Sequence, residues 1–116
     1  MQRNGDEIVS KEQILLYNST LQSITVKAAP ATVILYDYSG VQVVKLPFAR
    51  SNAGRYIFVQ ADIASATNYV SVTPASGDRI YSGTSVVTSV TLDAYSEDVL
   101  LFSDGMFWHV CTPVAT

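Results

Sequence analysis

The chain has 116 residues, a mass of 12.6 kDa and a formal net charge of −3, which fits one domain. β-Branched and aromatic residues, which favour strands, are abundant, whereas charged residues make up 15% of the chain against the usual ~25%. This composition excludes a coiled coil, a helical bundle and a disordered chain. The chain has no run of about 20 apolar residues and no signal-peptide pattern, so we expect no membrane partner and no leader.

The charges are unevenly distributed along the chain. Residues 1–60 have six basic and four acidic side chains, whereas residues 61–116 have six acidic side chains and one basic one, Arg79. A nucleic-acid binder needs clustered Lys and Arg to neutralise phosphates, so no nucleic-acid partner is expected. The weakly positive first half favours contact with an acidic protein surface, and chance scatter of few charges explains it equally well.

Residues 1–13 form a hydrophilic segment of mixed charge without a strand period. The segment predicts an extended N-terminal arm, with a short helical turn after Ser10 or a first strand as the alternatives. Ile8 and Val9 form an isolated apolar pair in the arm. A single folded domain is expected over residues 14–116.

From Ile14 onward, short apolar runs alternate with turn residues, which is typical of an all-β domain. We predict a small antiparallel β-sandwich or barrel, jelly-roll-like, with about eight or nine strands. After Ile14, the predicted strands cover residues 21–28, 32–36, 41–46, 55–60, 68–73, 79–81, 85–92, 98–103 and 106–111. The turn at residues 37–40 predicts one hairpin, and Asp104-Gly105 predicts another between the last two strands.

The last predicted hairpin has two apolar faces. Val99, Leu101, Trp108 and Val110 share one face, and Leu100, Phe102, Phe107 and His109 share the other. A half-exposed antiparallel strand alternates apolar and polar residues, so both faces are expected to be covered. Because a domain of this size has a limited interior, we assign Trp108 and Val110 to the core and the second set to a subunit interface.

Few residues are available for chemistry. His109 and Cys111 share a strand face, but two ligands fall short of a zinc site, and no third group is evident to orient the imidazole for a Cys–His nucleophile. Cys111 is therefore expected to be a buried, inert thiol. Asp93, Glu97 and Asp98 predict a solvated acidic loop rather than a calcium site. We expect no catalytic residue, no metal and no cofactor, and hence no enzyme.

Three segments, taken in order, resemble a known family. They are residues 44–47 (VKLP) followed by 53–58 (AGRYIF), residues 70–80 (VSVTPASGDRI) with Gly83 beyond, and residues 99–110 (VLLFSDGMFWHV). This pattern, over roughly residues 40–111, resembles the trimeric β-structured virion proteins of tailed bacteriophages. That family includes capsid decoration (cement) and head-fibre proteins, fibre heads and tail-needle knobs. The resemblance implies a homotrimeric structural protein of the virion, assembled in the host cytoplasm.

A short arm and one β domain favour a capsid decoration, cement or head-fibre protein that binds the major capsid protein or another virion protein. In this interpretation the arm docks on the capsid, with Ile8 and Val9 as apolar anchors and Arg3 and Lys11 meeting acidic groups. The alternative is the receptor- or glycan-binding tip of a tail fibre or tail needle. Five tyrosines in or near loops would then stack on a host-surface glycan: Tyr36, Tyr38, Tyr69, Tyr81 and Tyr95.

Overall fold

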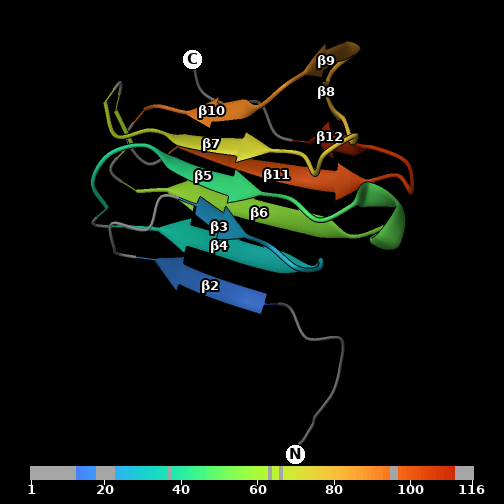
Figure 1. The fold of residues 1–116 in the computed structure, drawn as a ribbon, viewed down its shortest axis with the longest axis horizontal. Helices are drawn as coiled ribbons and strands as arrows, with labels where there is room; N and C mark the ends of the chain where they lie inside the picture. The colour runs from blue at the N-terminus through green and yellow to red at the C-terminus, as the bar shows by residue number, and fades with distance from the viewer. Residues whose placement is uncertain are drawn as a thin grey trace, which may run out of the picture.

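The computed structural model describes residues 13–17, 23–36, 38–62, 64–65, 67–94 and 97–111, which form two β-sheets (Figure 1). The smaller sheet contains, in spatial order, β10 (Val90–Leu92), β7 (Val70–Thr73), β5 (Gln42–Lys45) and β3 (Ser23–Thr25). The larger sheet contains β2 (Gln13–Tyr17), β4 (Ala31–Leu35), β6 (Tyr56–Ala61), β11 (Glu97–Ser103), β12 (Trp108–Val110), β8 (Ile80–Ser82) and β9 (Ser85–Val87). A short 3-10 helix, η1 (Ala49–Ser51), precedes β6. The all-β prediction is confirmed.

From β2 to β7 the chain alternates between the two sheets. Each strand therefore pairs with the next strand but one along the chain, and these pairs are parallel. Of the nine pairings in the described residues, five are parallel, so the prediction of an antiparallel sandwich is wrong and both sheets are mixed. The reason is that each connection crosses to the other layer, and the following strand returns in the original direction.

The hairpin predicted at residues 37–40 is absent, because β4 and β5 lie in different sheets. Within the connection Tyr38 is only 4% exposed, so its side chain packs into the core, whereas Ser39 and Val41 are exposed. The hairpin predicted at Asp104-Gly105 is confirmed: β11 and β12 are antiparallel, with Leu101 opposite Val110. Gly105 has a φ of +96°, which a residue with a side chain rarely adopts.

The number of strands also differs from the prediction. The described residues contain eleven strands rather than eight or nine. The segment predicted as one strand over residues 85–92 is divided into β9 and β10. β9 belongs to the larger sheet and β10 to the smaller one, so the intervening residues carry the chain between layers.

The inner faces of the two sheets share one hydrophobic core, which makes the fold sandwich-like. Alternate residues point inward, as the sequence predicts: Ile57 and Val59 of β6 and Val70 and Val72 of β7 are fully buried. Trp108 is the largest fully buried side chain, and its indole N–H donates to the carbonyl of Pro47 at 2.9 Å. Val110 is partly buried against the same core.

Candidate functional site

A row of mostly aromatic side chains crosses the outer face of the larger sheet. The strand register places Tyr56 opposite Phe102, Phe102 opposite His109, His109 opposite Tyr81, and Tyr81 opposite Val86. The ring centroids of Tyr56 and Phe102 are 4.9 Å apart, and those of Tyr81 and His109 are 5.5 Å apart with an interplanar angle of 17°. Five neighbouring strands thus present one continuous row.

A second, shorter row lies beside the first. Phe58 of β6 is opposite Leu100 of β11, and both side chains are half-buried. Farther along these strands, Gln60 is opposite Asp98, so the face becomes polar there. We call the apolar part of this surface the aromatic face. It consists of Tyr56, Phe58, Tyr81, Val86, Leu100, Phe102 and His109.

The outer face of the smaller sheet has a different character. Apart from Val43, its outward residues are polar: Ser23, Thr25, Lys45, Ser71, Thr73 and Thr91. This is the composition expected of a sheet face in water. On the larger sheet, by contrast, Tyr56 is 47% exposed and Val86 is 52% exposed. A contiguous exposed apolar patch is typical of an interaction site, so the aromatic face is the candidate functional surface.

The residues predicted for the subunit interface meet on this surface. Leu100, Phe102 and His109 belong to the aromatic face, and all three are half-buried. Phe107 lies at its border: its ring centroid is 5.5 Å from that of Tyr81, in an edge arrangement. Two segments far apart in the described chain, β6 and the β11–β12 hairpin, therefore supply one surface.

Sequence reasoning missed the other members of the aromatic face. Tyr56 and Phe58 alternate with the buried Ile57 and Val59, which is the same two-sided apolar pattern that singled out the last hairpin. That signal was present in the sequence. Tyr81 joins the face only through the parallel pairing of β8 with β12, and no sequence pattern predicts that pairing.

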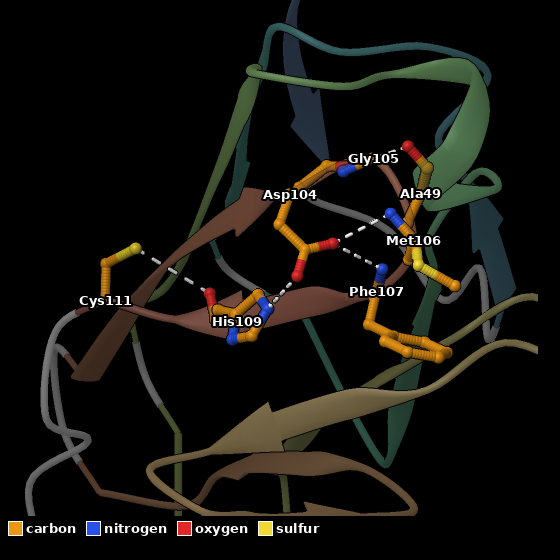
Figure 2. A network of polar contacts seen from close by, with 8 residues as sticks. Ala49, Asp104, Gly105, Met106, Phe107, His109 and Cys111 are labelled. Carbon is orange, nitrogen blue, oxygen red and sulfur yellow. Dashed lines mark hydrogen bonds and ion pairs between the residues drawn. The ribbon is translucent and has the colours of Figure 1, made fainter.

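Asp104 fixes the position of His109 (Figure 2). Its Oδ2 lies 2.7 Å from His109 Nε2, and its Oδ1 accepts hydrogen bonds from the amides of Met106 at 2.7 Å and Phe107 at 2.8 Å. The Phe107 amide, the His109 ring and the Met106 amide together lower the pKa of Asp104 to about 2. The expectation that no group orients this imidazole is therefore wrong.

Cys111 is exposed, so the prediction of a buried thiol is wrong. It follows the last residue of β12, and its amide still donates to the carbonyl of Leu100 at 2.8 Å. Its Sγ is 3.7 Å from the carbonyl oxygen of His109, and Figure 2 shows the thiol directed at this carbonyl rather than at the imidazole. Desolvation raises the pKa of the thiol. The geometry thus does not pair the sulfur with the histidine ring.

The acidic loop differs from the prediction at one residue. Glu97 is only 3% exposed, and its Oε1 accepts hydrogen bonds from the amides of Asp93 at 2.9 Å and Ala94 at 3.1 Å. Its carboxylate holds the turn before β11 instead of facing solvent, whereas Asp93 is exposed. Within the described segments, no three His, Cys, Asp or Glu side chains gather where they could hold a metal ion.

Of the tyrosines proposed for glycan stacking, Tyr38 and Tyr81 lie in different parts of the described structure. Tyr38 belongs to the core, and burial together with the charge of Asp62 raises its pKa to about 12. Tyr36 follows β4 of the larger sheet, and Tyr69 precedes β7 of the smaller sheet. Tyr81 belongs to the aromatic face, and Tyr95 lies outside the described residues.

Four residues predicted to dock on a capsid, Arg3, Ile8, Val9 and Lys11, also lie outside the described residues. In the part of the chain that the structure describes, no helix has the length and hydropathy needed to cross a membrane. Neither the protein-family models nor the curated proteins compared with this chain match it.

Proposed function

We propose that this protein is a non-enzymatic structural component of a phage virion that associates as a homotrimer through the aromatic face. The observation that carries the proposal is the continuous row of Tyr56, Phe102, His109, Tyr81 and Val86 on an outer sheet face. Water disfavours such a surface, and around a three-fold axis the same surfaces of the two neighbouring subunits cover it. The virion role rests on the resemblance of residues 40–111 to trimeric phage proteins.

The chemistry of the face suits association without catalysis. Its rings are held by contacts within the chain, such as Tyr56 with Phe102 and Tyr81 with His109, so little side-chain freedom is lost on binding. Aromatic side chains are enriched at the centres of protein interfaces. Each pair of subunits in the trimer is expected to bury at least ~1,200 Å², the lower limit for a stable interface.

Within this proposal the trimer binds the outer capsid surface through its N-terminal arms. Ile8 and Val9 supply apolar contacts, and Arg3 and Lys11 meet acidic groups of the major capsid protein or another virion protein. Three arms on one trimer act together, so modest affinity in each arm suffices for firm attachment.

Deletion of residues 2–12 tests attachment. The shortened protein should keep the mass of a trimer in solution and fail to sediment with particles that lack the wild-type protein. The control is the full-length chain added to the same particles, which should sediment with them. Equal sedimentation of both proteins would assign attachment to the β domain and contradict the role of the arm. If the full-length chain does not sediment with the particles, the capsid role itself is wrong.

A further inference from the structure

Among the residues that the structure describes, basic side chains gather at one end of the sandwich and acidic side chains at the other. One end, which we call the basic end, contains residues 26–30, 45–55, 74–79 and 104–107, the connections around η1 on the right of Figure 1. It has five cationic side chains and two acidic ones: Lys27, Lys45, Arg50, Arg55, Arg79, Asp78 and Asp104. The opposite end of the described chain has four acidic side chains and no cation: Asp62, Asp93, Glu97 and Asp98. The basic end therefore attracts anions.

A pocket of about 340 Å³ opens at the basic end. Its apolar lining includes Phe48, Met106 and Phe107, and Phe48 is 46% exposed and Met106 66% exposed. The guanidinium carbon of Arg50, which also lines the pocket, is 5.8 Å from the centroid of the Phe48 ring. That of Arg79 is 5.6 Å from the Phe107 ring. A pocket of this volume, with aromatic walls and few polar groups, is typical of sites for small ligands.

The polar wall of the pocket is held in place by the backbone. Oδ2 of Asp78 accepts a hydrogen bond from the amide of Ala49 at 2.9 Å, which ties the turn before β8 to η1. Gly77, which precedes Asp78, has a φ of +85°, and no heavy atom lies within 4 Å of the position that a Cβ would occupy there. The turn thus leaves open space beside the Asp78 carboxylate, in a pocket that Arg50 also lines.

We propose that this pocket binds an acidic sugar, a pyranose ring with a carboxylate group, as found in acidic polysaccharides. The apolar face of a sugar ring fits against the exposed ring of Phe48 and the half-buried ring of Phe107. The Arg50 guanidinium pairs with a carboxylate through two parallel hydrogen bonds. The Asp78 carboxylate accepts hydrogen bonds from sugar hydroxyls and opposes a doubly charged phosphate. The pocket shares Phe107 with the border of the aromatic face, and ligand binding is measured separately from self-association.

Titration of the isotope-labelled protein with sodium glucuronate, followed by NMR, tests the site. Saturable shifts should appear at the amides of Gly77, Asp78, Met106 and Phe107, with a dissociation constant in the millimolar range expected of a single sugar unit. Glucose, which has the same ring without the carboxylate, should bind at least about tenfold more weakly, because a charge-assisted hydrogen bond is lost. Inorganic phosphate should also bind more weakly than glucuronate.

Two variants distinguish binding in this pocket from general electrostatic attraction to the basic end. Arg50→Gln removes the guanidinium of an exposed residue, and it should weaken glucuronate binding at least about tenfold. The matched control is Lys45→Gln, which removes an exposed cation at the same end that does not line the pocket. This variant should leave glucuronate binding unchanged. Equal losses in the two variants, equal binding of glucose or of phosphate, or no saturable shift with glucuronate would each overturn the proposal.

Discussion

The carboxylate of Asp104 lies 2.7 Å from the imidazole of His109, across the hairpin that joins β11 to β12. The same carboxylate accepts hydrogen bonds from the amides of Met106 and Phe107, and His109 stacks on Tyr81 of β8. One acidic side chain therefore connects the turn of the hairpin to the centre of the aromatic face. Because this link determines where the imidazole lies, its loss should change the position of the His109 ring on that face as well as the conformation of the turn.

Acid should weaken the hairpin in a narrow pH range. The Phe107 amide, the His109 ring and the Met106 amide lower the pKa of Asp104 from 3.8 to about 2, so the carboxylate stabilises the fold fully above pH 3.8. This contribution is lost as the pH falls through about 2. A carboxyl chemical-shift titration of Asp104 should have its midpoint near pH 2, and a midpoint near 3.8 would contradict the assigned hydrogen bonds. Asp104→Asn should reduce the pH dependence of stability in this range, and Asp93→Asn serves as an exposed control.

Trp108 should be the most sensitive position of the core. Its side chain is 0% exposed, and Trp108→Ala is expected to lower the free energy of unfolding by about 3–5 kcal/mol. Trp108→Phe keeps most of the volume but leaves the carbonyl of Pro47 without its 2.9 Å donor, so a smaller loss of about 1 kcal/mol is expected. Urea unfolding measures both values. An unchanged midpoint for Trp108→Ala would contradict the buried position.

Asn52 should stabilise the basic end although it binds nothing at the surface. The residue is 3% exposed, its Oδ1 accepts from the amide of Ala29 at 2.8 Å, and its Nδ2 donates to the carbonyl of Phe48 at 2.8 Å. Asn52→Ala leaves the buried amide of Ala29 unpaired, whereas the carbonyl of Phe48 keeps its hydrogen bond from the Ser51 amide at 3.2 Å. A loss of about 1–3 kcal/mol is therefore expected in thermal or urea unfolding. The exposed neighbouring variant Ser51→Ala should change stability by less than about 0.5 kcal/mol. Equal effects would contradict these two hydrogen bonds.

Cys111 should react in the folded protein. The residue is exposed, so a maleimide or an aromatic disulfide reagent should modify it fully without denaturant. Because desolvation raises the pKa of the thiol, the rate at neutral pH should be lower than that of a free cysteine and should increase steeply with pH. Cys111→Ser is the control without a thiol. Modification only after unfolding would restore the buried position that the sequence pattern predicts.

The sequence predicts what depends on local alternation. Val70 and Val72, like Ile57 and Val59, alternate with less buried residues and point into the core, and Asp104-Gly105 forms the turn that its composition indicates. The two-sided pattern of the last hairpin also predicts that Leu100 and Phe102 lie on an apolar outer face. Such features are determined within a few residues.

Features that depend on pairing between distant segments could not be predicted. Nothing in the run from Thr32 to Leu46 distinguishes a hairpin from a crossing between sheets, because both need a short connection between two strands. Tyr81 reaches the aromatic face only through the parallel pairing with β12. Glu97 looks like a solvated acid in the sequence, and only the turn folded over it shows that its carboxylate accepts amide hydrogen bonds.

Self-association through the aromatic face is tested most directly by the mass of the protein in solution, measured by light scattering at micromolar concentration. Wild-type protein should have three times the chain mass of 12.6 kDa. Leu100→Asp places a charge in the proposed interface, and Val86→Asp does the same at a residue that is 52% exposed, so the second variant should fold normally. Both should be folded monomers, whereas Val43→Asp, on the outer face of the smaller sheet, should remain trimeric. A monomeric wild-type protein, or Leu100→Asp and Val86→Asp variants that stay trimeric, would contradict the proposed interface.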